Sequence, residues 1–384
     1  MSATSSERQT LDAVLQSLWP NGSCPTRRVR LLPSADRPRL IVPERPRRAA
    51  ATLAGALRER GSLTARLRTR ALRMGFASGL AGFGPGSWVA VPEGGIDDEL
   101  ARQFGEPVTV AVHLGPPRAN RKPVLAIARP DGSLLGFAKL GINSLSDALV
   151  RNETEALRRL ATAALPGVVV PELLHSGTYG AHPLLVQSAL PVAKSRPATA
   201  DELRAAQVEV ARAFGTTTTH LADATYLDAL RARAVELPML TERLMSVIDD
   251  LRHVHAELEV EFGCWHGDWR PVNVAALAGR TLVWDWERFT TDVPLGYDAL
   301  HQSLAQATRS GTPPDQLPVA LTKQAPQLLQ PFGVAAGSVP VLTRLYLVEL
   351  AVRYLGDDQA GAGARLGRID EWLLPHLEKR TVQP

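Results

Sequence analysis

One stretch in the second half of the chain constrains this sequence more than any other. It spans residues 264–287 and reads C-W-H-G-D-W-R-P-V-N-V-A-A-L-A-G-R-T-L-V-W-D-W-E. Apolar runs at 272–277 and 281–284 predict two short strands, and the Ala-Gly-Arg between them predicts a hairpin turn. Such a hairpin would bring Asn273 and Asp285 together although they are distant in sequence.

The polar side chains of this stretch suit phosphoryl transfer. Asn273 offers a neutral oxygen and Asp285 a charged one, and Mg²⁺ usually takes only one or two protein oxygens beside water and phosphate. Asp268 is a candidate to orient or deprotonate an attacking hydroxyl. Taken singly, an aspartate here is more often a cap or turn residue, and a lone His266 a satisfied core residue. The residues occur together and in order, which favours the phosphoryl-transfer interpretation.

The motif H-G-D-W-R-P-V-N followed by V-W-D-W-E resembles the signature of the aminoglycoside phosphotransferase and choline kinase group, small-molecule kinases of protein-kinase-like fold. It is also similar to the protein-kinase loop H-R-D-L-K-P-E-N. The resemblance implies that Asp268 is the catalytic base and that Asn273 and Asp285 hold magnesium. It further implies that Arg270, which replaces a lysine, faces the γ-phosphate of ATP. The implied cofactors are ATP and Mg²⁺.

Upstream, the sequence predicts a small antiparallel sheet with one helix. Strands are expected at 108–114, 124–128 and 134–140, with Pro-Asp-Gly as the turn before the third. A helix is expected at about 146–163. This order resembles the N-lobe of the same family.

Within that resemblance, Lys139 is the lysine that binds nucleotide phosphate, and Glu153 is the helix glutamate that pairs with it. Glu155 is the alternative on another helix face. A lysine on an inward-facing strand costs desolvation free energy unless an anion pairs with it. The plainer interpretation of Lys139 is an edge-strand lysine whose amine reaches solvent.

Two further nucleotide contacts are expected from element order. The loop at 115–123 has one glycine and three prolines, so it cannot cradle phosphates through backbone N–H groups in the usual way. Its Arg118, Arg121 and Lys122 either supply side-chain charge or are simply solvated. Residues Gln187 and Ala189 fall where the family's interlobe hinge binds adenine through the backbone.

The predicted fold class is α+β: a two-lobed protein-kinase-like fold with an extra N-terminal α/β cap region. Residues 1–105 are the cap, of unknown role; 106–190 are the N-lobe; 191–384 are a mainly helical C-lobe. One long helix is expected at 240–262 and another at 200–220. An arginine-rich helix at 62–74 is interpreted as an ordinary helix with a solvated basic face rather than as a site for an anionic partner.

Composition sets the remaining bounds. The chain has 384 residues, of which 45% are hydrophobic and 21% charged, with a formal net charge of +4. The polar N-terminus predicts no signal peptide, and no apolar run is long enough to span a membrane. Two cysteines form no framework, so a reducing cytoplasm is expected. Nucleic acid and membrane are not expected partners, and the oligomeric state stays open.

The predicted function is an ATP-dependent small-molecule kinase that transfers the γ-phosphoryl group to a hydroxyl. A sugar, an amino alcohol, an aminoglycoside-like compound and a natural-product intermediate all remain open as acceptors. Acidic residues of the second lobe are scattered among arginines, which argues weakly against a polycationic acceptor. The alternative is a catalytically weak or silent nucleotide-binding protein. A protein kinase is disfavoured because W-D-W-E replaces D-F-G and no A-P-E segment follows.

Overall fold

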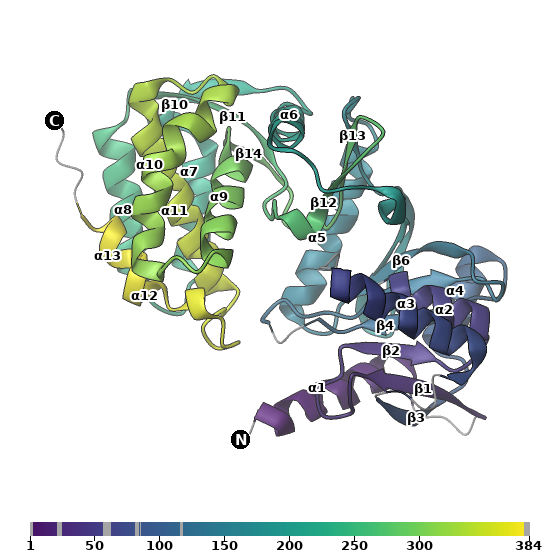
Figure 1. The fold of residues 1–384 in the computed structure, drawn as a ribbon. Coiled ribbons are helices and arrows are strands. Elements are labelled where there is room, and N and C mark those ends of the chain that lie inside the picture. Colours follow the sequence, from purple (N-terminus) through teal and green to yellow (C-terminus); the bar gives the residue numbers. More distant parts are fainter. Residues whose placement is uncertain are drawn as a thin grey trace. The chain divides into compact units, whose positions relative to one another are not determined.

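The computed structural model describes residues 3–20, 25–56, 63–80, 84, 86–115 and 118–379. The chain divides into two compact units. The N-terminal unit comprises Met1–Thr154 and Pro171–Leu190, and the C-terminal unit comprises Glu155–Val170 and Pro191–Pro384. In Figure 1 the first unit is built on a sheet, whereas the second consists mostly of helices.

The N-terminal unit is organised on one antiparallel sheet with the strand order β3-β1-β2-β4-β5-β6-β9-β8. Its strands are β1 (Thr26–Leu32), β2 (Leu40–Pro43), β3 (Ser87–Pro92), β4 (Thr109–His113), β5 (Val124–Ala128), β6 (Leu134–Leu140), β8 (Leu173–Tyr179) and β9 (His182–Ser188). Its helices are α1 (Ala3–Leu18), α2 (Arg47–Ala56), α3 (Leu63–Ser78) and α4 (Ile96–Phe104), and α5 (Ser144–Leu160) begins in it.

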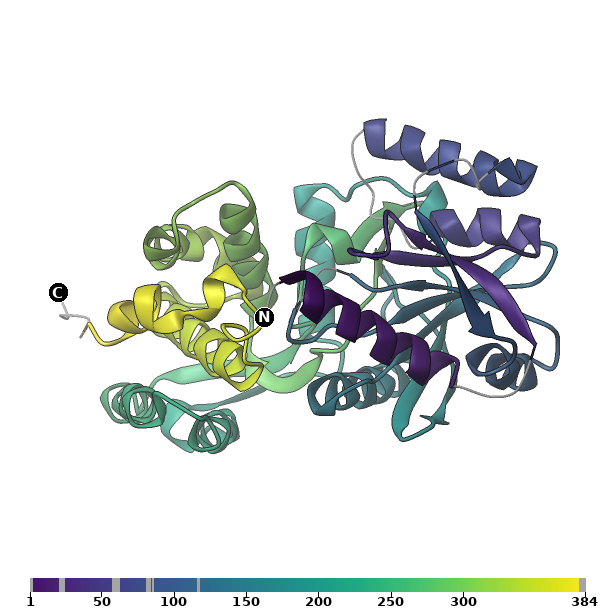
Figure 2. The ribbon, with the colours of Figure 1, turned by 90° about the horizontal axis from the view of Figure 1, so that it is seen from below.

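The two faces of this sheet differ in residue size. Because side chains alternate along a strand, Leu125 and Ile127 of β5 join the cluster that contains α1 and α4, whereas Ala126 and Ala128 join the one that contains α2. Figure 2 shows α2, with α3 outside it, on the side opposite α1. Lys139 alternates with Ala138 and Leu140 of the α1 face, and therefore lies on the alanine-rich face.

Residues 1–105, predicted as a cap region, belong to the same compact unit as the strands that follow them. Strand β2 pairs with β4, so β1, β2 and β3 extend the sheet itself. The buried Asp97 carboxylate ties these pieces together, because it accepts hydrogen bonds from Trp19 Nε1 (2.8 Å) and from the Val110 backbone N–H (3.2 Å). The compact unit consequently runs from the N-terminus through β9. On α3, the described Arg68, Arg70 and Arg73 are exposed.

The C-terminal unit combines helices with two small sheets. The strands are β7 (Val168–Val169), β10 (Thr217–His220), β11 (Glu259–Trp265), β12 (Val274–Leu277), β13 (Arg280–Val283) and β14 (Thr290–Pro294). The helices are α6 (Ala200–Ala211), α7 (Thr225–Val235), α8 (Thr241–Val254), α9 (Tyr297–Arg309), α10 (Leu317–Leu329), α11 (Val339–Gly356), α12 (Ile369–Trp372) and α13 (Leu374–Leu377). The strand orders are β10-β11-β14 and β12-β13-β7.

Two predicted helices are shorter than expected. The one at 240–262 ends at Val254, and β11 follows, in which Val260 and Phe262 are buried while Glu259 is exposed. The one at 200–220 ends at Ala211, and the threonines at 217–219 form β10 instead. In both segments a two-residue alternation or β-branched side chains override the helical pattern.

Helix α11 is buried on nearly all sides and forms the centre of the main hydrophobic core of this unit. An antiparallel sheet with a partner helix in one unit and a mainly helical second unit confirm the predicted fold class. Among the described residues, no helix has both the length and the apolar character required to cross a bilayer.

Candidate active site

The N-terminal unit contains a buried ion pair between Lys139 and Glu153. Both carboxylate oxygens of Glu153 lie 2.6 Å from the Lys139 Nζ, and the two side chains are 0% and 6% exposed. Lys139 is paired on both sides, with Val124 of β5 and Leu185 of β9, so it lies on a central strand. The interpretation as an edge-strand lysine is therefore wrong. Glu155, the alternative, is exposed and lies beside Arg158.

The other residues of this unit that were predicted to contact nucleotide lie in the loop at 115–123 and at the end of β9. Arg121 is half-buried and donates from Nε to the Leu114 carbonyl at 2.7 Å, whereas Arg118 is exposed. Pro116 and Pro117 of the same loop lie outside the described residues. Gln187 lies in β9 opposite Phe137, and its buried Oε1 has no hydrogen-bond partner among the described residues. Ala189 follows the last residue of β9.

In the C-terminal unit, the predicted hairpin is formed by β12 and β13. Leu277 pairs with Arg280, which leaves Ala278 and Gly279 as a two-residue loop with φ of 51° and 78°. Positive φ at both positions is the geometry of a type I′ turn, whose twist matches that of the strands. The ladder continues beyond the strands, because the Trp284 N–H donates to the Asn273 carbonyl at 3.1 Å. The hairpin thus brings Asp285 to the end of the ladder that carries Asn273.

The side chains at this end of the hairpin are suited to hold a cation. Asn273 Nδ2 donates to the carbonyl of Asp268 at 2.9 Å, and since a carbonyl can only accept, the amide orientation follows. The Asn273 amide oxygen is then free to act as a ligand. Asp285 has φ 72°, an unusual value for a non-glycine residue that is typical of functional sites. Glu287 is buried and has a carboxylate oxygen within 4.8 Å of one from Asp285.

The loop that follows β11 is held by the buried carboxylate of Asp298. This residue, in the first turn of α9, accepts from the backbone N–H groups of His266 (2.7 Å) and Gly267 (3.0 Å). Asp298 therefore connects α9 to the loop, while the N-cap position of this helix is Gly296, which has no side-chain cap. Burial raises the pKa of Asp298 to about 7 despite these donors. Gly267 has φ 81°, and a Cβ there would lie 2.4 Å from the Arg288 carbonyl.

His266 connects this loop to the hairpin. Its Nδ1 accepts from the Asp268 N–H at 3.1 Å, so the ring proton is on Nε2, which donates to the Trp284 carbonyl at 3.0 Å. The ring is fully buried, and burial lowers its pKa. His266 is therefore a satisfied core residue that fixes the distance between the loop and the segment carrying Asp285.

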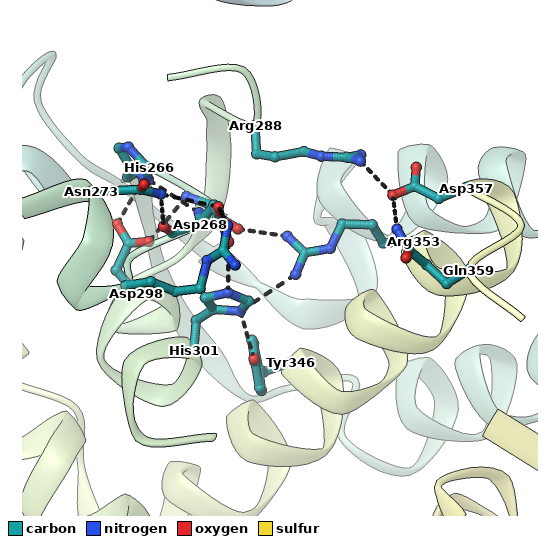
Figure 3. A network of polar contacts seen from close by, with 12 residues as sticks. His266, Asp268, Asn273, Arg288, Asp298, His301, Tyr346, Arg353, Asp357 and Gln359 are labelled. Carbon is teal, nitrogen blue, oxygen red and sulfur yellow. Dashed lines mark hydrogen bonds and ion pairs between the residues drawn. The ribbon is translucent and has the colours of Figure 1, made fainter. Parts of the chain in front are cut away.

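The Asp268 carboxylate is surrounded by donors (Figure 3). Its Oδ2 accepts from Arg270 and from Asn273 Nδ2 (3.1 Å), and its Oδ1 lies 3.4 Å from His301 Nε2. Burial alone would raise the pKa of Asp268, but His301 and Arg270 outweigh it and hold that pKa well below the usual range. Asp268 is thus a carboxylate at neutral pH. Arg270, predicted to face the γ-phosphate, contacts this carboxylate in the structure.

Three residues of this region were missed from the sequence. Glu287 was part of the W-D-W-E motif but was given no role. His301 and Arg353 lie on α9 and α11, in segments where no local pattern marks them. The signal that was available for His301 is its place one helical turn after Asp298, on the same face of α9.

The sequence matches no protein-family model and no curated protein. Among solved structures, it is similar to an apo form of aminoglycoside phosphotransferase APH(4)-Ia, with 16% identity, a TM-score of 0.48, and coverage of 74% of this chain and 99% of the other.

Two further structures are similar at the same level. One is a protein from Haemophilus somnus assigned as a fructosamine-3-kinase (13% identity, TM-score 0.44, 74% and 96% coverage). The other is the amicoumacin kinase hAmiN in complex with AMP-PNP, Ca²⁺ and Ami (13% identity, TM-score 0.42, 70% and 89% coverage). The group that the motif resembles is therefore found among the similar structures.

Proposed function

We propose that this protein is an ATP-dependent kinase that phosphorylates a hydroxyl group of a small molecule. The proposal rests chiefly on the C-terminal unit, where Asp268 is an ionised carboxylate and the Asn273 amide nitrogen donates to Asp268, which leaves the amide oxygen as the possible ligand atom. That arrangement suits a base for a hydroxyl beside a ligand for a hard cation. The buried Lys139 of the N-terminal unit supports it, because Glu153 keeps its amine ready for a phosphate.

In this mechanism the residues of the chain mainly position and stabilise charge. Lys139 would bind a phosphate of ATP, and Asn273 and Asp285, with Glu287 as a further candidate, would hold magnesium. When bound there, magnesium would supply positive charge that balances the charge developing on the transferred phosphoryl group. Asp268 accepts a hydrogen bond from the acceptor hydroxyl and takes its proton as the new P–O bond forms. The bond between the γ-phosphorus and the bridging oxygen of ATP breaks in the same transfer, and ADP is the leaving group. Arg270 holds Asp268 through its guanidinium, and its contact with the γ-phosphate stays a prediction from the family resemblance.

A second candidate function is nucleotide binding without turnover. The glycine-poor loop at 115–123 favours it, since it lacks the backbone N–H groups that usually cover phosphates. Against it, Lys139, Asp268, Asn273 and Asp285 are all present. The acceptor is not specified by these residues; sugars, amino alcohols, aminoglycoside-like compounds and natural-product intermediates remain candidates.

Two measurements in sequence test the proposal. Thermal melting with and without ATP and magnesium first asks whether nucleotide binds, because a ligand that binds only the folded state raises Tm. A panel of hydroxyl-bearing metabolites, incubated with ATP and magnesium, is then scored by mass spectrometry for the gain of one phosphoryl group. We expect a Tm increase and at least one phosphorylated product. A Tm increase with no product and no ADP release would support the silent nucleotide-binding protein instead.

A further inference from the structure

Helix α9 contacts the catalytic loop through two residues on one face. Asp298 binds the loop backbone, as described above, and His301 follows one turn later and reaches the side chain of Asp268. Residues three apart lie on the same side of a helix, so both contacts come from one rigid element. In Figure 3 the His301 ring lies between the Asp268 carboxylate and the Tyr346 hydroxyl.

The surroundings of His301 decide which ring nitrogen carries the proton. Tyr346 Oη lies 3.0 Å from Nδ1, and Arg353 Nη2 lies 3.4 Å from the same atom. A guanidinium can donate but never accept, so Nδ1 must be the acceptor. The ring proton is therefore on Nε2, the atom that faces Asp268 Oδ1 at 3.4 Å.

His301 has little freedom to leave this position. Its side chain is 7% exposed, and its ring lies edge-on to Trp265 (centroids 6.5 Å apart) and to Tyr346 (6.3 Å). Burial lowers its pKa to about 4, which agrees with a neutral ring that carries one proton. A buried, neutral imidazole whose second nitrogen is already occupied is a fixed donor and not a proton carrier.

Arg353, on helix α11, contacts both the loop and His301. Its Nη1 donates to the Gly267 carbonyl at 2.6 Å while its Nη2 faces His301. The guanidinium also lies over the Trp265 ring, 5.7 Å from the centroid. Arg353 thus holds the residue before Asp268 and the histidine that contacts Asp268 with a single group, so α9 and α11 act together on the loop.

We propose that His301 is a positioning residue for Asp268. It donates from Nε2–H to Oδ1 while Arg270 donates to Oδ2, and together they fix the plane of the carboxylate so that its remaining lone pairs face the acceptor hydroxyl. The 3.4 Å separation is long for an N–H···O bond, which suits orientation rather than tight binding. His301 takes up no proton during the reaction, because its Nδ1 is occupied by donors. The proposal rests on the proposed function, in which Asp268 is the base.

The kinetic test compares two substitutions at His301, one that removes the hydrogen-bond donor and one that keeps a donor. His301→Leu keeps bulk but removes the donor, whereas His301→Gln places an amide N–H near the position of Nε2. We expect His301→Leu to lower kcat about 10- to 100-fold, as for a displaced catalytic group, with KM for ATP changed less than about 2-fold. We expect His301→Gln to recover most of the loss. His253→Gln, at an exposed histidine on α8 whose Nδ1 hydrogen-bonds the Asp249 carbonyl of its own helix, is the matched control.

Two kinetic outcomes would overturn the proposal. If Leu and Gln lower kcat equally while both proteins keep the wild-type Tm, the donor is irrelevant. If the loss lies in KM for ATP and not in kcat, His301 acts on nucleotide binding. Turnover is measured with an acceptor from the panel or, where none is found, as ADP release with water as acceptor.

A second measurement does not depend on turnover. With ¹⁵N-histidine labelling, NMR distinguishes a protonated Nε2 from a protonated Nδ1, and His301→Gln identifies the resonance. We expect the Nε2–H form at pH 7, and a shift of the Nε2 resonance in Asp268→Asn. A protonated Nδ1, or a resonance unaffected by Asp268→Asn, would reject the contact. If wild-type protein releases no ADP at all, the proposed function fails, whereas this measurement still decides whether His301 is a donor to Asp268.

Discussion

The two units hold their key charges in different ways. In the N-terminal unit, the Lys139 ammonium on a central strand is balanced by the Glu153 carboxylate on α5, and both side chains are almost completely buried. In the C-terminal unit, the Asp268 carboxylate has contacts with Arg270 of the same loop, with Asn273 and with His301 of helix α9. Arg270, its charged partner, is 27% exposed and can reach water.

This difference predicts how each unit tolerates the loss of a charge. Removing one member of a buried pair leaves an uncompensated buried charge, so function and stability are lost together. Replacing Asp268 by asparagine keeps one acceptor oxygen for its donors, and Arg270 can reach solvent, so activity should be lost while the fold is kept. The following substitutions test this contrast.

The largest expected effect is on turnover, from Asp268→Asn. Loss of a general base typically lowers the rate by about 10²- to 10⁴-fold, and we expect kcat to fall within this range while Tm changes by only a few degrees. Phosphotransfer and thermal melting are measured on the same preparation. Asp315→Asn, at an exposed position, is the control. Full activity in Asp268→Asn would remove this residue from the mechanism.

The second substitution, Lys139→Met, should affect stability and nucleotide binding together. Breaking a buried ion pair costs about 3–5 kcal/mol, and the phosphate contact is lost as well. We expect a clearly lower Tm and no Tm increase on adding ATP and magnesium. The double variant Lys139→Met with Glu153→Gln should melt above the single variant, because no unpaired charge remains. Lys323→Met, exposed on α10, is the control; a single variant as stable as this control would contradict the contrast between the units.

The third prediction concerns pH and Asp298, whose pKa burial raises from 3.8 to about 7. Because the folded-state pKa lies above the unfolded one, this carboxyl binds a proton on folding at intermediate pH. Its contribution to stability is present below about pH 4 and is lost as pH rises through about 7, with a slope of at most about 1.4 kcal/mol per pH unit. Asp268 and Arg353 are the charged groups that act on it.

Asp298→Asn tests this assignment. The variant loses one backbone contact, so we expect a lower Tm at every pH. Its Tm should also decline less steeply than that of the wild type between pH 5 and pH 7.5. Parallel curves for the two proteins would show that Asp298 does not titrate in this range, and that its two backbone donors keep it ionised.

The smallest expected effect is at the hairpin turn. Ala278 has φ 51°, a conformation that asparagine tolerates better than alanine. We expect Ala278→Asn to stabilise the protein by about 0.5–1 kcal/mol, seen as a Tm increase of one or a few degrees. Gly279→Ala should act in the opposite direction because Gly279 has φ 78° and no neighbouring atom within 4 Å, so only backbone strain is changed. A lower Tm in Ala278→Asn would argue against the type I′ turn.

Much of the candidate site was readable because it is local in sequence. The strands β12 and β13 with their turn bring Asn273 and Asp285 together through nearest-neighbour pairing, and alternation with turn residues predicts such hairpins well. The choice of Glu153 over Glu155 needed the structure, because both lie on α5 and only the register of the helix against β6 decides which one meets Lys139.

The sequence by itself determined the hairpin, the order of the candidate catalytic residues and the helical character of the second unit. Only the tertiary structure decided that β1, β2 and β3 extend the sheet, and that His301 and Arg353 contact Asp268 and Gly267 in the loop that follows β11. The physical reason is the sequence separation between the residues that interact. Local patterns arise from backbone geometry and burial within a few residues, whereas the pairing of β2 with β4 and the contact of α11 with α9 depend on how distant segments pack, which leaves no periodic signal in either segment.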